Sequence, residues 1–351
     1  MKNRWLGMAC ALPLLVACNS ESSAIPVSSE TVSQKQIETI VSNIKKLYPE
    51  ATPEQKLRAA KTVVRAIEEL VFVEGGSFDM GDFGAPCEPP SRTPNRMDWS
   101  PDVQCLSSPS SGETGAYKLH KVTLDSYSIA KFETRFIDME WMRQITGLPV
   151  ARDLSKNGPH VERDSKRYEV LITKRKNNAA ATKTWQDAKD YCQWLGVVSA
   201  LPFDLPTEAQ WEYAARNRGE KVYFATNNGY AQLQGGDYFD PASGRYIDYT
   251  DEEVNAAKRI EDVDAYPPNP LGMAGMSNQI SEWVNDWYAK DYYLVSPERN
   301  PQGPKSGTEK VRRDAAGTTM VFSRIHDLPE LERYFPSVSF RCALQQSMPA
   351  K

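Results

Sequence analysis

The sequence predicts a mixed α+β protein that is poor in regular secondary structure and begins with a helical hairpin. In residues 31–70, apolar residues recur at three- and four-residue spacing, which is the period of amphipathic helices. From residue 71 onward this periodicity becomes rare, and glycine, proline and aromatic residues interrupt short strand-like runs. The first observation predicts the hairpin, and the second predicts a loop-rich domain after it.

Residues 1–17 have the features of a secretory signal peptide. Lys2 and Arg4 give a positive start, and the apolar run that follows is shorter than the roughly 20 residues that a membrane-spanning helix needs. The run ends in Leu-Val-Ala-Cys, which resembles a bacterial lipobox whose cysteine, here Cys18, becomes lipidated. Because Asn19 stands where an Asp would favour inner-membrane retention, we expect a periplasm-facing lipoprotein of the outer membrane, held there by its lipid.

A tether and a helical hairpin are predicted after the signal. Residues 18–30 are small and polar, which is typical of a flexible tether. Residues 31–70 contain two apolar stripes, and Thr52 and Pro53 form a typical helix start between them. Two helices with a short Pro-containing turn favour a hairpin, which we expect to pack on the following domain. The stripes consist of Ile37, Ile40, Val41, Ile44 and Leu47, then Leu57, Ala60, Val64, Ile67 and Leu70.

Two further helices are predicted inside the loop-rich region, residues 71–346. The first covers residues 184–196, where Trp185, Ala188, Tyr191, Cys192 and Leu195 share one helical face. The second begins at Thr207, a good N-cap residue. Glu208 and Glu212 lie toward its positive end, and Arg216 and Arg218 lie toward its negative end, as the helix dipole favours.

Composition limits the classes of function and of cysteine chemistry. A net charge of −4 with 25% charged residues gives no electrostatic footprint for nucleic acid. If Cys10 leaves with the signal and Cys18 carries lipid, four of the six cysteines remain, in an oxidising compartment. Four cysteines suggest two disulfides with three alternative pairings, and sequence alone does not choose among them. The stretch between Cys87 and Cys105 looks like an inserted loop closed on itself.

Between residues 71 and 346, short motifs follow one another in a recognisable order. They read FVEGGSFDMGD (72–82), HKVTLDSYSIAKFETRFIDMEWM (120–142), TWQDAKDYCQWLG (184–196), LPTEAQWEYAARNRG (205–219), NPLGMAGMSNQISEWVNDWY (269–288) and SFRCAL (339–344). They resemble successive motifs of the formylglycine-generating enzyme, or sulfatase-modifying factor, family. The resemblance implies a variant of the C-type-lectin-like fold, which is compact but poor in regular secondary structure.

The resemblance also implies a disulfide. Family members often carry one cysteine in the helix with the pattern YC-x-W and another in the terminal FRC motif, and in the generating enzyme these two are joined. Cys192 and Cys342 match those positions. We therefore predict a Cys192–Cys342 disulfide, and we also predict that Cys87 pairs with Cys105.

The residues that the family's chemistry requires are missing. The aerobic enzyme holds copper(I) with two cysteines five residues apart before the terminal motif, whereas residues 316–338 contain no cysteine. The thiolate is the nucleophile and the soft ligand that copper(I) requires, so a hydroxyl such as that of Ser323 does not replace it. The iron-dependent sulfoxide synthases of the family need three histidines, but His120, His160 and His326 are widely separated in the sequence. We predict no catalytic residue.

A structural calcium ion is an open alternative. In the generating enzyme, the Asn and Glu of a GNVWEW motif help to bind calcium, and the corresponding stretch here holds Asn278, Gln279 and Glu282. An amide oxygen is a suitable ligand for a hard cation. The competing interpretation is that Glu282 is hydrogen-bonded to loop backbone, and no other cofactor is expected.

Two functional hypotheses follow. The first is a non-catalytic lipoprotein whose loops bind a protein partner on a rigid scaffold; an immunity protein that neutralises a type VI secretion effector, such as a phospholipase, is one such role. The second is an enzyme with altered or metal-dependent chemistry in the old cleft. Arg, Trp and Tyr dominate interface energetics. The predicted partner contacts are Arg92, Arg96, Trp99, Tyr238, Tyr246 and Tyr249.

Overall fold

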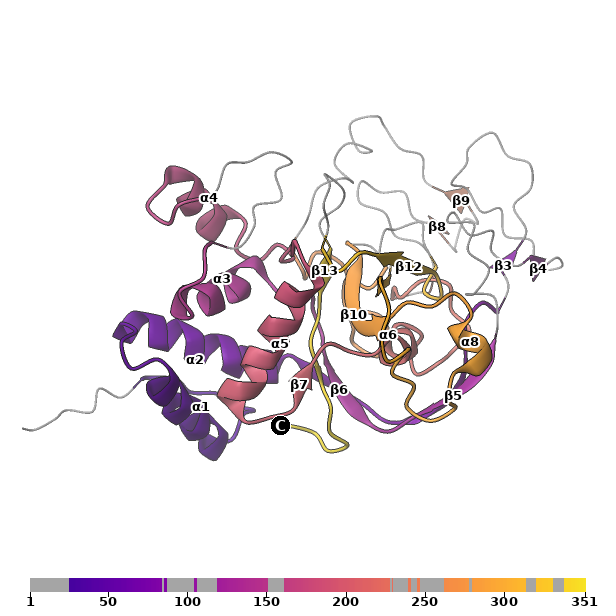
Figure 1. Ribbon diagram of the computed structural model, residues 1–351, viewed down its shortest axis with the longest axis horizontal. Helices are drawn as coiled ribbons and strands as arrows, with labels where there is room; N and C mark the ends of the chain where they lie inside the picture. The colour runs from indigo at the N-terminus through magenta and orange to yellow at the C-terminus, as the bar shows by residue number, and fades with distance from the viewer. Residues whose placement is uncertain are drawn as a thin grey trace, which may run out of the picture.

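A computed structural model of the chain has a helical part and a sheet part (Figure 1). It describes residues 25–83, 85–86, 104–105, 119–150, 161–227, 229, 239–240, 245–246, 262–277, 280–313, 320–330 and 338–351. The helices are α1 (Gln34–Leu47), α2 (Pro53–Glu68), α3 (Phe136–Ile145), α4 (Lys166–Lys174), α5 (Trp185–Ser199), α6 (Glu208–Ala215) and α8 (Tyr292–Val295).

The strands are short and lie mostly in the sheet part. They are β1 (Leu70–Val73), β2 (Gly76–Met80), β3 (Ala85–Pro86), β4 (Gln104–Cys105), β5 (His120–Leu124), β6 (Tyr127–Ala130), β7 (Phe203–Asp204), β8 (Phe239–Asp240), β9 (Arg245–Tyr246), β10 (Glu282–Trp287), β11 (Lys310–Arg313), β12 (Arg324–Asp327), β13 (Ser339–Phe340) and β14 (Ala343–Leu344). This mixture of helices and short strands confirms the predicted α+β class with little regular secondary structure.

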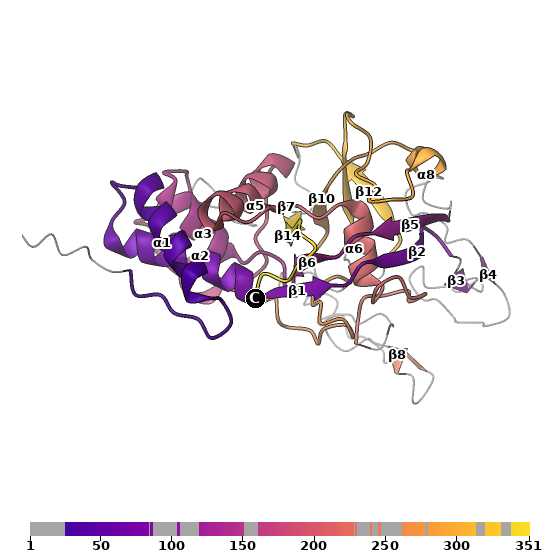
Figure 2. The same cartoon turned by 90° about the horizontal axis from the view of Figure 1, so that it is seen from below.

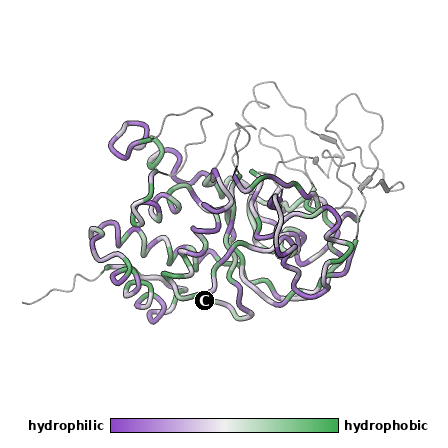
Figure 3. The backbone as a smooth tube through the Cα atoms, viewed as in Figure 1, coloured by the Kyte–Doolittle hydropathy of each residue, from purple (hydrophilic) through white to green (hydrophobic). Residues whose placement is uncertain are grey.

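The predicted hairpin is present as α1 and α2, which pack against each other and against α3 and α5 (Figures 1 and 2). Hydrophobic and hydrophilic residues alternate along these helices, and the hydrophobic ones form their buried face (Figure 3). Ile40, Ile44 and Ile67 are fully buried. Leu47, predicted in the first stripe, is instead 42% exposed and is the last residue of α1.

Local capping fixes where the helices begin. The Thr52 hydroxyl accepts a hydrogen bond from the Gln55 amide while the Gln55 side chain accepts one from the Thr52 amide, which is a capping box. The same reciprocal arrangement joins Thr207 and Gln210 at the start of α6, as the N-cap prediction for Thr207 requires. These caps satisfy backbone donors that would otherwise have no partner at the helix end.

Two four-stranded sheets bring segments that are far apart in the sequence side by side. One has the strand order β1-β6-β14-β7, so the strand nearest the C-terminus lies between two much earlier strands. The other has the order β12-β11-β10-β13, in which only β10 and β13 run parallel. Strand pairs β2-β5, β3-β4 and β8-β9 complete the sheet part.

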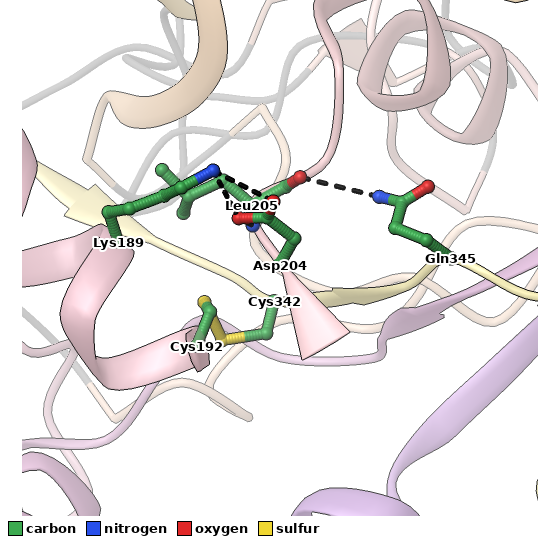
Figure 4. The surroundings of a disulfide bond; sticks show 6 residues. All are labelled: Lys189, Cys192, Asp204, Leu205, Cys342 and Gln345. Atoms are coloured by element: carbon green, nitrogen blue, oxygen red, sulfur yellow. Dashed lines mark hydrogen bonds and ion pairs between the residues drawn. A yellow bond between two sulfur atoms is a disulfide. The ribbon is translucent and has the colours of Figure 1, made fainter. Parts of the chain in front are cut away.

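A disulfide links the helical part to the sheets. Cys192 of α5 and Cys342, between β13 and β14, have an S–S distance of 2.00 Å and a Cα–Cα distance of 5.5 Å (Figure 4). The predicted Cys192–Cys342 bond is therefore confirmed. Cys105 lies in β4 opposite Ala85 of β3, but Cys87 lies outside the described residues. The Cys87–Cys105 bond stays a prediction.

Replacing both Cys192 and Cys342 with alanine should lower the free energy of unfolding by about 5 kcal/mol, since the bond closes a loop with a sequence separation of 150. Urea denaturation of the purified variant measures the loss. The matched control replaces Cys87 and Cys105 with serine. A bond there would close a much shorter loop, so its removal should cost only about 3 kcal/mol. An unchanged urea midpoint in the Cys192 and Cys342 variant would contradict a stabilising role for that bond.

Candidate functional site

The middle of the sheet part holds a group of buried charged side chains, which we call the buried charge network. Its members are contributed by α6, β10, β11, β12 and the turn between β13 and β14. None is more than 5% exposed. The network consists of Glu208, Glu212, Arg216, Glu282, Asp286, Arg313, Arg324 and Arg341.

Arg313 of β11 joins two carboxylates on one face of α6. Its Nη1 donates to Glu208 Oε1 at 2.9 Å, and its Nη2 donates to Glu212 Oε2 at 3.0 Å. Residues four apart on a helix lie on the same face, so a single planar guanidinium reaches both. Arg324 Nε also donates to Glu208 Oε1, at 2.7 Å, and Arg216 Nη1 donates to Glu212 Oε1 at 2.8 Å. Each carboxylate is thus shared by two arginines.

The family-like motif residue Glu282 forms a bidentate pair with Arg341. Arg341 Nη2 donates to Glu282 Oε1 and Arg341 Nε donates to Glu282 Oε2, both at 2.7 Å. Trp211 Nε1 also donates to Glu282 Oε2, at 3.0 Å. Both carboxylate oxygens therefore accept hydrogen bonds from side chains and not from loop backbone.

This geometry does not suit Glu282 as a calcium ligand, because a cation at either oxygen would lie close to the fully buried Arg341 guanidinium. Asn278 and Gln279 lie outside the described residues. Across the described ranges, no cluster of three or more His, Cys, Asp or Glu side chains is arranged to hold a metal ion. The calcium site stays a prediction from the resemblance.

Burial and neighbouring charges shift the pKa values in this region. Burial raises the pKa of Asp286 to about 7, and the nearby Glu208 carboxylate adds to the effect. Burial acts on Glu208 as well, but Arg324 and Arg313 outweigh it and hold the pKa of Glu208 below its usual value. Burial, with the charge of Glu282, raises the pKa of Glu133 well above its usual range. The network thus keeps some carboxylates charged and favours the protonated form of others.

Beside the network, Lys310 lies between two indole rings. Its Nζ is 3.7 Å from the ring centroid of Trp185 and 3.8 Å from that of Trp287, and it donates to the Asn285 carbonyl at 2.9 Å. Burial lowers the pKa of Lys310 to about 8, while the two ring faces attract the ammonium form. Lys310 is 2% exposed, so this arrangement fastens β11 to β10 and α5 rather than offering an open amine.

The predicted partner contacts all lie in segments for which side chains are not described. Arg92, Arg96, Trp99, Tyr238 and Tyr249 lie outside the described residues, and Tyr246 is described only as part of strand β9. The histidines His120 and His326 lie on β5 and β12, and His160 lies outside the described residues. Among the described residues, no helix combines the length and apolar character that crossing a membrane requires.

Sequence analysis missed the buried charge network. The sequence positions of Glu208, Glu212 and Arg216 predict only that these charges complement the helix dipole, whereas the structure buries all three. A signal was present, because these charges alternate with Trp211 and alanines along a short helix that has no polar face. A helix that is buried all round must pair its charges internally.

Comparison with known proteins places these features in a family context. Residues 55–342 match the model of the sulfatase-modifying factor enzyme 1-like domain. The formylglycine-generating enzyme of Mus musculus is 32% identical over 143 residues, which are 40% of this chain and 36% of that enzyme. The serine/threonine-protein kinase pkn1 of Chlamydia pneumoniae is 33% identical over 132 residues, 37% of this chain and 17% of that kinase. The chain therefore matches well under two thirds of these relatives.

Among solved structures, PvdO from Pseudomonas aeruginosa superposes with a TM-score of 0.53 over 79% of this chain and 94% of that one. The sequence identity is 18%, so the likeness concerns the fold alone. It agrees with the predicted fold of the formylglycine-generating-enzyme type.

Replacing Arg313 with methionine should destabilise the protein by about 3–5 kcal/mol, because it leaves the buried Glu208 and Glu212 carboxylates short of a partner. Chemical denaturation at neutral pH measures the change. Lys121→Ala is the matched control, because its pair with Glu298 is exposed and should contribute little. Equal stability of the two variants would mean that Arg313 does not neutralise the α6 carboxylates.

Asp286→Asn should remove a pH dependence of stability. The folded-state pKa of about 7 lies above the usual value of 3.8, so the folded state binds the proton more tightly and its advantage is lost as pH rises toward 7. As pH rises from 3.8 to about 7, the free energy of unfolding of the asparagine variant should therefore increase relative to that of the parent, by up to about 1.4 kcal/mol per pH unit. Denaturation curves at several pH values test this, with the exposed Asp190→Asn as control. Parallel pH profiles for Asp286→Asn and the parent would rule out the protonated carboxyl.

Proposed function

The chain belongs to the sulfatase-modifying factor enzyme 1-like family, and from this premise we propose that it is a non-catalytic envelope lipoprotein that binds a protein partner. The observation that carries the proposal is the absence of the family's catalytic cysteines from a chain that keeps the residues of the fold. Residues 316–338 contain no cysteine. The side chains that hold the fold, by contrast, are in place: Arg313 pairs with Glu208 and Glu212, and Arg341 pairs with Glu282.

The missing thiols weigh against formylglycine generation by this chain. A thiolate supplies both the nucleophile and the soft copper(I) ligand, and an alcohol oxygen is not a soft ligand for copper(I). The two cysteines near the family motifs, Cys192 and Cys342, are consumed in a buried disulfide. A chain that keeps its frame and lacks its reagents is more simply a binding protein than a catalyst, although a shared fold alone does not decide function.

The proposed compartment is the bacterial envelope. The charged start, the short apolar run and the lipobox-like sequence ending at Cys18 support a lipid anchor on Cys18. We propose that the anchored protein is sorted to the outer membrane and faces the periplasm. A binding lipoprotein in this place could act as an assembly partner of surface machinery or as an immunity protein. Neutralising a type VI secretion effector, such as a phospholipase, is the narrower form of the second role.

The proposed contact surface consists of the segments around Trp99 and Tyr246. They are rich in arginine, tryptophan and tyrosine, which carry most of the energy in protein interfaces. Loops that rest on a rigid frame are where binding residues concentrate. The frame in this case is the disulfide-linked core with its buried ion pairs.

The alternative is an enzyme with altered or metal-dependent chemistry. It has one observation in its favour, since the pKa values of Asp286 and Lys310 are moved toward neutrality, as is common in active sites. Both side chains, however, are 2% exposed and bonded to protein groups. Structural ion-pair networks produce the same shifts, so binding is the better supported function.

Detergent extraction of the envelope followed by affinity capture of the native lipoprotein should recover a protein partner in a stoichiometric complex. Alanine replacement of Trp99, Tyr246 or Tyr249 should weaken that complex by roughly thirtyfold at the most important position, the equivalent of about 2 kcal/mol. Calorimetric titration of the purified partner measures the affinities, and Phe72→Ala, an exposed aromatic on β1, is the control.

Three results would contradict the proposal. The first is unchanged affinity in all the loop variants while their melting temperatures match the parent. The second is a result that argues against the lipid anchor. The parent protein would be recovered in the soluble fraction, or a Cys18→Ser variant would fractionate like the parent. The third is metal-dependent or thiol-independent turnover of a substrate peptide by the purified protein, which would favour the enzyme instead.

A further inference from the structure

A polar groove opens where four distant segments of the chain meet, and we call it the amide groove. Its volume is about 190 Å³. Five of its eleven lining residues carry a side-chain amide, and Leu124, Tyr127 and Thr207 also line it. It is formed by the turn between β5 and β6, the start of α6, the loop after α8 and the segment after β14, with Asp125, Ser126, Gln210, Asn300, Gln302, Gln345, Gln346 and Ser347 among its residues.

The floor of the amide groove is a reciprocal pair of amides. Gln210 Nε2 donates to Gln345 Oε1 at 2.8 Å, and Gln345 Nε2 donates to Gln210 Oε1 at 3.1 Å. Gln345 also donates to the Leu205 carbonyl at 3.4 Å, near the Cys192–Cys342 disulfide (Figure 4). Gln210 is only 8% exposed and belongs to the capping box of α6, so the pair rests on a fixed element.

A second reciprocal pair fixes another wall of the groove. The Asp125 amide donates to Asn300 Oδ1 at 2.9 Å, and Asn300 Nδ2 donates to Asp125 Oδ2 at 2.8 Å. The Asn300 backbone amide also donates to the Thr123 carbonyl at 2.9 Å. Asn300 has a φ of +44°, in the left-handed region that asparagine tolerates better than most residues. The wall is therefore held in a conformation that few other side chains would adopt.

Hydrogen-bonding capacity remains at the rim. A carboxamide offers two donor hydrogens and an oxygen with two acceptor positions. Within the part of the chain that the structure describes, Gln302 donates only to the Asn300 carbonyl and Gln346 only to the Met348 carbonyl. Both side chains therefore keep an acceptor oxygen and a second N–H for a ligand. The carboxylate of Asp125 is already paired with Arg299, which leaves the groove without an uncompensated charge.

We propose that the amide groove is a binding site for a neutral saccharide. Each sugar hydroxyl both donates and accepts, which matches the mixed donors and acceptors of fixed amides. A charged ligand would meet no counter-charge. Leu124 and Tyr127 also line the groove, but they are only 4% and 1% exposed, so a protein segment would find little apolar surface for an anchor. Because hydrogen bonds to the ligand replace those to water, each adds little, and the dissociation constant is about 1 mM.

Saturation-transfer difference NMR tests the site on the full lipoprotein, kept in micelles of a detergent without a sugar headgroup. The probes are D-glucose, D-galactose, N-acetyl-D-glucosamine and maltose, each at about 10 mM, ten times the expected dissociation constant. A tri-alanine peptide with blocked ends is the probe for the protein-segment alternative. At least one saccharide should receive saturation from the protein, and the peptide should not.

Substitutions test whether the saccharide signal arises from the amide groove. Gln345→Ala and Gln302→Ala should each weaken saccharide binding at least tenfold, and Ser347→Trp, at an exposed rim position, should block it sterically. Gln186→Ala on α5 removes an exposed glutamine elsewhere and should bind like the parent. If Gln345→Ala disturbs folding, as judged by its melting temperature, the Ser347→Trp result decides.

Three outcomes would overturn the proposal: no saccharide signal, a signal that survives Ser347→Trp, or transfer to the peptide alone. None of them bears on the protein partner, which is tested separately.

Discussion

The ion pair between Arg341 and Glu282 is the contact on which the rest of the fold depends. Both side chains are fully buried, and the Arg341 guanidinium also donates to the carbonyls of Ala130, Lys131 and Ala274. One residue therefore ties the C-terminal segment to β6, to β10 and to the loop before β10. Its chain neighbour, Cys342, adds the covalent link to α5. Loss of either charge would leave the other buried and unpaired, which is among the costliest changes in a protein interior.

The surrounding network gives specificity rather than simple stability. Moving charges from water into a core costs several kcal/mol per ion, and pairing only offsets this where the geometry is good. Arg313, held between Glu208 and Glu212, meets that condition with donor distances of 2.9 and 3.0 Å. An apolar core can slide between packings of similar energy, whereas a fork-shaped guanidinium accepts one arrangement. We therefore expect the network to favour one arrangement of these short strands over alternative packings.

The residues that stabilise the fold are different from those proposed to contact other molecules. Lys310 is buried and held between the half-buried rings of Trp185 and Trp287, so these side chains join β10, β11 and α5. Binding is then left to surfaces carried by the frame. The amide groove is one such surface, fixed by reciprocal pairs at Gln210 and Asn300. The proposed partner contact around Trp99 is another. A rigid frame with separate contact surfaces suits the proposed binding role better than chemistry in a cleft.

The sequence by itself determined the features that depend on near neighbours. Apolar periodicity and the caps at Thr52 and Thr207 specified the helices, because a helix is built from contacts three and four residues apart. The fold type and the Cys192–Cys342 bond, whose cysteines are 150 positions apart, were implied only by the resemblance of the motif order to a known family. The sequence also shows directly that residues 316–338 contain no cysteine.

Only the tertiary structure decided which charges are buried and what they meet. Glu282 and Arg341 are 59 positions apart, and nothing in the local sequence of either specifies the other. Arg216 follows the same rule, since its sequence position suits an exposed helix end and its side chain lies fully buried against Glu212. The amide groove likewise joins residues as distant as Asp125 and Gln345. Such partners are selected by the packing of whole elements, because a buried charge or a fixed amide is satisfied by whatever the fold brings within about 3 Å.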